Sequence, residues 1–125
     1  TAIRGRIKKL EESGVMRIMA TVSPMRLGGF RQAFLGLGVK PPYRLDTEQL
    51  LAIDEVTYAM SGVGLNGADY LIEVIADTDE DLWRVVDESI RSLPGVEQTW
   101  WASTVSVEKE SYWLEPPHEG VLLGD

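Results

Sequence analysis

The sequence predicts an α+β domain of the ferredoxin-like type, in which one antiparallel βαββαβ sheet carries two helices on one face. Three observations lead to this fold class. After Gln32, four segments alternate apolar and polar residues or run as short apolar stretches, which is typical of strands. Two further segments repeat apolar residues at helical spacing. These lie between the first and second strands and between the third and fourth, and prolines and glycines separate the segments.

The first strand is expected over residues 32–40. Alternate residues from Ala33 to Val39 are apolar and share one face of it. Gly36 and Gly38 lie on the other face and leave a strip that another backbone or helix can approach closely. A short helix follows, and its predicted cap is Asp46 or Thr47.

The second and third strands are expected over residues 56–62 and 70–76. The loop between them, residues 62–67, matches G-x-G-x-x-G. A dinucleotide site needs that loop to open a helix, whereas the residues after it alternate as a strand. The pattern therefore favours a long hairpin connection with an Asn-Gly turn.

Thr78 is expected to cap a long helix that Pro94-Gly95 ends, and the last strand is expected over residues 96–108. Trp100 and Trp101 fall on opposite faces of this strand. We favour core or interface packing for them over base stacking, because the surrounding segment is acidic. Apolar residues on both faces of a sheet with helices on one side predict a second copy, and hence an oligomer.

Charge divides the chain. Residues 1–40 contain eight basic and two acidic side chains, and residues 41–125 contain four basic and eighteen acidic ones. In residues 1–13, Ile3, Ile7 and Leu10 form one helical stripe that is surrounded by basic residues. A cationic helix joined to an acidic body predicts contact of that helix with nucleic acid.

The sequence gives little support for a catalytic, metal-binding or cofactor-binding site. The chain has no cysteine, and its one histidine is His118 in the Pro/Gly-rich tail, so we predict no enzyme, no metal site and no cofactor. Glu73, in the middle of a strand, has three interpretations: it faces solvent, pairs with a charge across an interface, or is catalytic. No apolar run has the length of a membrane span. A cytoplasmic protein is expected, and a chain that opens on Thr1 suggests a fragment or a processed chain.

Several motifs resemble the Lrp/AsnC family, the leucine-responsive or feast/famine transcription regulators. Residues 3–16, IRGRIKKLEESGVM, resemble the recognition helix and wing, and Pro24 with Leu27-Gly28 resembles the linker. Ser61-Gly62 with Asp69-Tyr70-Leu71, and Leu93-Pro94-Gly95-Val96, resemble the effector-domain signatures. The resemblance extends from Thr1 to about Lys109.

This resemblance implies the end of a truncated winged helix-turn-helix at residues 1–15, a linker strand and turn at 16–31, an effector and oligomerisation domain at 32–112, and a tail at 113–125. It implies dimers that associate further, duplex operator DNA as a partner, and an amino acid bound between dimers. By position, the DNA-binding residues are Arg4, Arg6, Lys8 and Lys9. The effector-binding residues are Gly62, Gly67, Asp69, Thr99, Ser103 and Thr104.

The sequence departs from the family pattern at two places in the effector site. The Gly-to-Asp loop is longer, so either Gly62 or Gly67 is the family's glycine. Trp101 occupies a threonine position, unless Thr104 takes that role, and an aromatic wall would favour an effector with an aromatic or large apolar side chain over asparagine or glycine. Asp69 would anchor the ammonium group, or would simply close the hairpin. Two other functions remain open: an amino-acid-sensing module that does not bind DNA, and a dimeric ferredoxin-like barrel enzyme.

Overall fold

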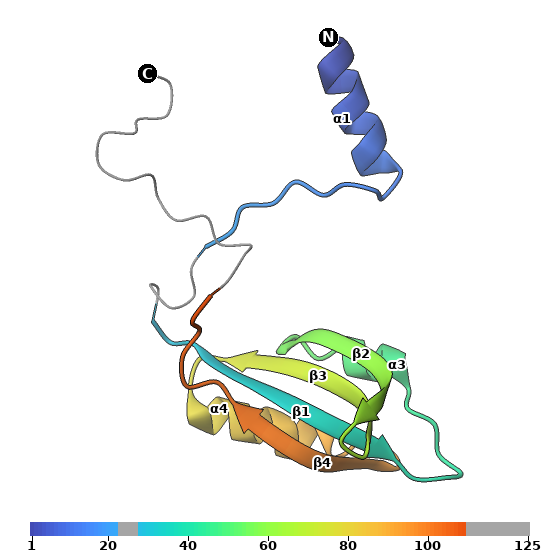
Figure 1. Ribbon diagram of the computed structural model, residues 1–125, viewed down its shortest axis with the longest axis vertical. Coiled ribbons are helices and arrows are strands. Elements are labelled where there is room, and N and C mark those ends of the chain that lie inside the picture. The colour runs from blue at the N-terminus through green and yellow to red at the C-terminus, as the bar shows by residue number, and fades with distance from the viewer. Residues whose placement is uncertain (23–27, 110–125) are drawn as a thin grey trace. The chain divides into compact units, whose positions relative to one another are not determined.

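The computed structural model describes residues 1–22 and 28–109. The chain divides into two units, a helical N-terminal segment and a compact α+β unit (Figure 1). In chain order the elements are α1 (Ala2–Glu12), β1 (Arg31–Val39), α3 (Thr47–Leu51), β2 (Val56–Leu65), β3 (Ala68–Ala76), α4 (Asp79–Arg84), η1 (Val85–Ile90) and β4 (Val96–Ser103).

The N-terminal segment contains the predicted helix α1. Thr1 caps it, because its hydroxyl accepts a hydrogen bond from the backbone N–H of Arg4 at 3.5 Å. The helix ends before Gly14, whose φ of +76° suits glycine at this position. The linker strand expected after it does not form, because residues 16–22 pair with no described strand. Part of the turn expected next, residues 25–27, lies outside the described residues.

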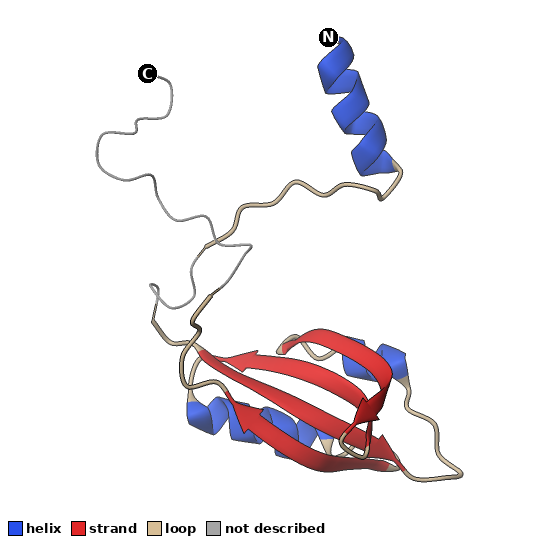
Figure 2. Ribbon diagram, in the orientation of Figure 1, coloured by secondary structure: helices blue, strands red, loops and turns tan. Residues whose placement is uncertain are grey.

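Residues 28–109 form the predicted ferredoxin-like fold. The four strands make one sheet in the order β2-β3-β1-β4, and every neighbouring pair is antiparallel. The helices α3 and α4 lie on one side of this sheet (Figure 2). We call the other side the open face. From the strand register, it is formed by Gln32, Phe34, Gly36, Gly38, Tyr58, Met60, Leu71, Glu73, Ile75, Glu97, Trp100 and Ala102.

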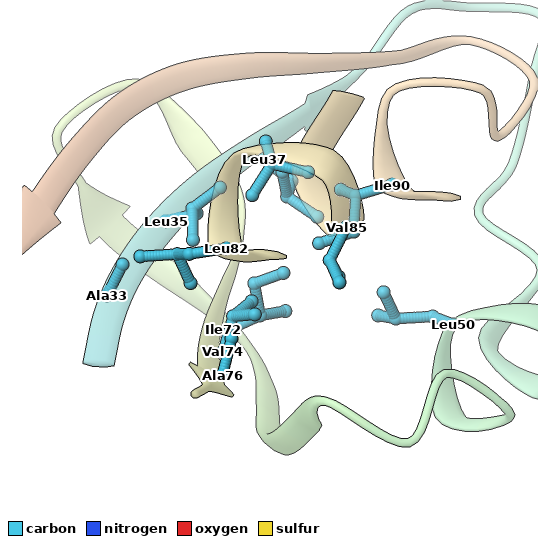
Figure 3. Packing of buried hydrophobic residues seen from close by; sticks show 11 residues of the cluster. Ala33, Leu35, Leu37, Leu50, Ile72, Val74, Ala76, Leu82, Val85 and Ile90 are labelled. Atoms are coloured by element: carbon cyan, nitrogen blue, oxygen red, sulfur yellow. The ribbon is translucent and has the colours of Figure 1, made fainter. Parts of the chain in front are cut away.

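The hydrophobic core lies between the sheet and the helices (Figure 3). Alternate residues of β1 and β3 face the apolar stripe of α4 and η1, and Leu50 of α3 closes the other end. The largest fully buried side chains are Leu35, Leu37, Leu50, Ile72, Ile90, Val74 and Val86. The predicted alternation of β1 is confirmed, since Ala33, Leu35 and Leu37 are fully buried.

Both predicted helix caps of this unit are present. The Asp46 carboxylate accepts hydrogen bonds from the backbone N–H groups of Glu48 at 3.0 Å and Gln49 at 3.3 Å, so the cap of α3 is Asp46 rather than Thr47. The Thr78 hydroxyl accepts one from the Asp81 N–H at 3.1 Å. The predicted long helix is present. Its second half, η1, has π-helical hydrogen bonding, which the sequence did not predict.

Two strand boundaries differ from the prediction. β2 continues to Leu65 and β3 starts at Ala68, so the glycine-rich loop shrinks to the turn Asn66-Gly67. Both turn residues have positive φ, +52° and +83°, as a type I′ turn requires. β4 ends at Ser103 rather than at residue 108. Ser103 pairs with Ala33, near the start of β1, and the Thr104 N–H donates a hydrogen bond to the Gln32 carbonyl at 2.9 Å.

Candidate effector cleft and cationic helix

The β2–β3 hairpin is irregular near its tip. Ser61 pairs with Tyr70 and Leu65 pairs with Ala68, so β2 has two more residues than β3 between these pairs. Gly64 in this stretch has a φ of +80°, which a larger residue adopts only with strain. We call residues 62–65 the hairpin arm. The regular pairing of β2 with β3 is therefore interrupted along the hairpin arm.

Asp69 lies at the base of this hairpin, beside the end of β1. Its Oδ2 accepts a hydrogen bond from the backbone N–H of Val39 at 3.0 Å. Asp69 is exposed, and Oδ1 forms no hydrogen bond with any residue that the structure describes. The carboxylate therefore joins β3 to the end of β1, rather than closing the β2–β3 hairpin as one interpretation predicted, and its second oxygen has no partner among the described residues.

A cleft of about 630 Å³ opens at this end of the sheet. It is formed by the end of β1, the loop from β1 to α3, and the adjoining parts of β2 and β3. Its lining residues are Val39, Tyr43, Arg44, Leu45, Ser61, Gly62, Val63, Asp69 and Tyr70. The lining contains one anionic side chain, Asp69, and one cationic side chain, Arg44.

Among the described residues, Arg44 is the cation at this end of the sheet that has no ion-pair partner. Lys40 is close in sequence, but its Nζ pairs with Oε1 of Glu97 at 2.8 Å. The hydrogen bond to Glu97 and the charge of Glu97 raise the pKa of Lys40. Arg44 forms no ion pair within residues 1–22 and 28–109.

The structure brings together only part of the predicted effector set. Gly62 and Asp69 both line the cleft, whereas Gly67 forms the hairpin tip. Thr99 lies on β4 with its methyl group against Gly38. Ser103 and Thr104 lie at the far end: Ser103 pairs with Ala33, six residues before Val39 and so about 20 Å along β1.

The sequence interpretation missed Tyr43 and Arg44. They lie in the connection after β1, and they join the site because that connection and the β2–β3 hairpin meet at the same end of the sheet. The ferredoxin-like order of the strands is sufficient to predict that this connection lies next to the hairpin. An antiparallel β1 and β3 place the end of β1 beside the start of β3, and hence beside Asp69.

The two tryptophans of β4 have different surroundings on opposite faces, as predicted. The ring of Trp101 stacks on Trp83 on the helix side, with centroids 4.8 Å apart and an interplanar angle of 23°. Its Nε1 donates to the Ser103 hydroxyl at 2.6 Å. Trp101 therefore does not line the cleft, and the aromatic wall expected from it is wrong. Trp113 and His118 lie outside the described residues.

Glu73 belongs to a polar row across the open face. Its Oε2 accepts a hydrogen bond from Gln32 Nε2 at 2.5 Å, and its Oε1 accepts one from the Thr57 hydroxyl. The Thr104 hydroxyl donates to Gln32 Oε1 at 2.7 Å and extends the row. Among the described residues, neutral groups hold this half-buried carboxylate, and no cation pairs with it. The row gives it a structural role in the sheet.

The helix α1 presents all its side chains to solvent within the described chain. Arg4, Arg6, Lys8 and Lys9 are exposed, and Lys8 forms an ion pair with Glu12 at 3.8 Å. The apolar stripe is also uncovered: Ile3 is 70% exposed and Leu10 is 42% exposed. An isolated stripe of this kind suits a helix that packs in a domain of its own.

Two negative findings hold for residues 1–22 and 28–109. No group of three or more His, Cys, Asp or Glu side chains is arranged to hold a metal ion. No helix there combines the length and the apolar character that crossing a membrane requires.

A curated relative decides the family. The chain is 33% identical over 113 residues to the HTH-type transcriptional regulator FL11 of Pyrococcus abyssi, a match that covers 89% of this chain and 73% of the relative. The chain belongs to the Lrp/AsnC family of transcription regulators. No family model matches the sequence.

Solved structures of Lrp/AsnC regulators share the fold of this chain. The structure of E. coli AsnC superposes with a TM-score of 0.73 at 22% identity and covers 87% of this chain and 74% of AsnC. A feast or famine regulatory protein from M. tuberculosis, complexed with L-methionine, gives a TM-score of 0.74 at 22% identity, over 92% of this chain and 78% of that one. A Neisseria meningitidis transcriptional regulator in complex with L-methionine gives 0.74 at 19% identity, over 92% of this chain and 76% of that one.

Proposed function

We propose that this Lrp/AsnC protein is a DNA-binding regulator whose α+β unit assembles with other copies and binds a zwitterionic amino acid in the cleft. The observation that carries the effector proposal is the presence of one anionic side chain, Asp69, and one cationic side chain, Arg44, in the lining of a cleft of about 630 Å³. A free amino acid presents one ammonium and one carboxylate group, so this pair matches its charges. Two related structures are complexes with L-methionine, which supports the ligand class.

Each charged end of the effector has a suitable partner. Asp69 Oδ1 receives the ammonium group while Oδ2 stays bonded to the Val39 N–H. The planar guanidinium of Arg44 receives the carboxylate, a geometry for which arginine is better suited than lysine. Val39, Leu45 and Tyr70 provide apolar lining for the effector side chain. In this proposal, Gly67, Thr99, Ser103 and Thr104 act only where a second copy brings them to the cleft.

Calorimetric titration of the twenty amino acids tests the cleft. We expect at least one to bind, and we expect Asp69→Asn and Arg44→Gln each to weaken that binding at least tenfold. The reason is that a hydrogen bond to a charged group contributes about 1.5–3 kcal/mol. Asp69→Asn keeps one acceptor for the Val39 N–H and removes the charge and the second acceptor oxygen, which the ammonium group would need.

Asp54→Asn is the matched control, because Asp54 is exposed and lies outside the cleft. It is expected to bind the amino acid as the wild type does. Equal affinity for wild type, Asp69→Asn and Arg44→Gln would refute the charged anchors. Failure of every amino acid to bind below millimolar concentration would remove the effector function.

The open face supports the assembly proposal. Phe34, Leu71 and Ile75 are only partly buried there, and no helix of residues 28–109 covers them. A layer of apolar side chains on a sheet needs a second layer, and a second copy of the same face supplies one with two-fold symmetry. We expect the interface to bury more than roughly 1,000 Å², the lower range for a specific contact.

The cationic helix supports the DNA proposal. Arg4, Arg6 and Lys9 are exposed and form no ion pair among the described residues, so their charges are available to phosphates. The apolar stripe on the other side of α1 would hold the helix in a helix-turn-helix domain. The relative FL11 is named as an HTH-type regulator, which agrees with this role. Since a regulator of this kind acts by binding, we propose no catalytic residue.

Binding to duplex DNA at several salt concentrations tests α1. Docking a recognition helix needs the other helices of the motif, so the measurement uses α1 within a complete helix-turn-helix domain. Arg6→Ala is expected to lower operator affinity and to reduce the salt slope by about one unit, the loss of one phosphate contact. Arg84→Ala, which removes a charge that pairs with Asp81 in the α+β unit, serves as control. Unchanged affinity and slope for both Arg4→Ala and Arg6→Ala would place α1 outside the DNA interface.

A further inference from the structure

Residues 62–64 of the hairpin arm have no pairing partner on β3. Between the pairs Ser61–Tyr70 and Leu65–Ala68 the β2–β3 ladder is interrupted, and Gly62 and Gly64 add backbone freedom there. The side chain of Leu65 folds back over Gly62, since a Cβ at Gly62 would lie 3.3 Å from Leu65 Cδ1. Yet this arm contributes Gly62 and Val63 to the cleft. Its position therefore requires a support from outside the hairpin.

Trp100 provides that support from the opposite edge of the sheet. Its Nε1 donates a hydrogen bond to the carbonyl oxygen of Leu65 at 2.8 Å, a contact between residues 35 positions apart in the chain. The donor is on β4 and the acceptor at the end of β2, which are the two edge strands of the sheet. The indole is half-buried, and this bond uses its single polar group.

Gly36 of β1 allows the indole of Trp100 to lie across this strand. Trp100 pairs with Gly36 of β1, and a Cβ at Gly36 would lie 2.2 Å from Trp100 Nε1 and 2.3 Å from Cε2. The pyrrole ring therefore lies directly on the backbone of β1, in the strip that the sequence predicted. A register shift at Gly36/Leu37 leaves Thr99 as an extra residue on β4, which sets Trp100 opposite Gly36.

We propose that Trp100 is a positioning residue for the effector cleft: its indole lies on Gly36 and fixes the hairpin arm through the Leu65 carbonyl. The effect of Trp100 on effector binding rests on the proposed effector function. The contact by which Trp100 holds the hairpin arm does not. Trp100 also lies on the open face, so the same side chain joins the surface proposed for assembly to the arm that lines the cleft.

Hydrogen exchange on the full chain without ligand tests the structural part. Trp100→Phe keeps an aromatic ring and removes the N–H, while Gly36→Ala keeps Trp100 and fills the space under its indole. Both variants should speed exchange of the amides of residues 62–68 about three- to tenfold, the ratio expected for one lost hydrogen bond. Trp83→Phe is the control for removing an indole from the other face. Phe34→Leu is the control for altering the open face away from the arm. Both controls should leave these rates unchanged.

Titration of the twenty amino acids into the same variants tests the consequence. An amino acid that binds wild type should bind Trp100→Phe and Gly36→Ala more weakly, by a similar factor, and should bind Trp83→Phe normally. Hairpin exchange in Trp100→Phe and Gly36→Ala equal to that of wild type would overturn the proposal. Faster exchange with unchanged affinity would overturn the positioning role. Faster exchange in a protein whose wild type binds no amino acid would support the contact between Trp100 and the hairpin arm while refuting the effector function.

Discussion

Replacing Leu71 with aspartate is expected to convert the assembled protein into monomers. Leu71 lies on the open face, between Met60 of β2 and Gly36 of β1 in the strand register. A carboxylate there would be taken out of water by the second copy without a cation to pair with, and an unpaired buried charge is strongly unfavourable. We expect the dissociation constant of the assembly to rise at least about 100-fold, the ratio that 2.7 kcal/mol gives.

Light scattering over a range of micromolar concentrations measures this change. Leu51→Asp is the control, because Leu51 is 64% exposed on α3, on the helix side of the sheet. It should keep the molar mass of the wild type. A Leu71→Asp protein that keeps the wild-type mass would place the interface elsewhere, and a wild type that is monomeric at these concentrations would refute assembly itself.

The next residue on β3 has the opposite role. Ile72 is fully buried and packs in the core between the sheet and the helices. Ile72→Ala is expected to lower the free energy of unfolding by about 2–5 kcal/mol, through lost burial and the cavity left behind. Because Leu71 and Ile72 point to opposite faces, the first should change assembly and the second should change stability.

Urea unfolding followed by tryptophan fluorescence measures the stability change. Trp83 and Trp101 stack within this unit and report its unfolding. All variants are compared at one protein concentration, because assembly contributes to apparent stability. Leu51→Ala, at a largely exposed leucine, should stay within about 0.5 kcal/mol of the wild type. Equal losses for Ile72→Ala and Leu51→Ala would contradict the described core.

Local patterns in the sequence were sufficient to predict most of the fold. The alternation of β1 identified its buried face because side-chain period decides which residues meet the helices. Asp46 and Thr78 marked helix starts because their oxygens satisfy free N–H groups. Asn66-Gly67 marked the hairpin turn because both positions need positive φ. Each signal concerns residues within a few positions of one another.

The errors concern effects that depend on distant residues. β4 ends beside the start of β1, where Ser103 pairs with Ala33, and no local property of residues 104–108 reveals this. The π-helical half of the long helix and the register shift beside Gly36 likewise depend on packing rather than on propensity. The sequence identified Gly62 and Asp69 as site candidates, but it missed Arg44. The hydroxyls of Ser103 and Thr104 fell far from the cleft, because sequence position does not show which end of a strand adjoins it.

A crystal structure of the full chain with the amino acid that binds most tightly is the most direct test of the effector cleft. The account predicts that this amino acid occupies the cleft, with its ammonium group within about 2.7–3.2 Å of the Asp69 carboxylate. It also predicts that the carboxylate of the amino acid faces the guanidinium of Arg44. An amino acid bound away from Asp69 and Arg44, or an empty cleft at saturating concentrations of every amino acid, would contradict the account.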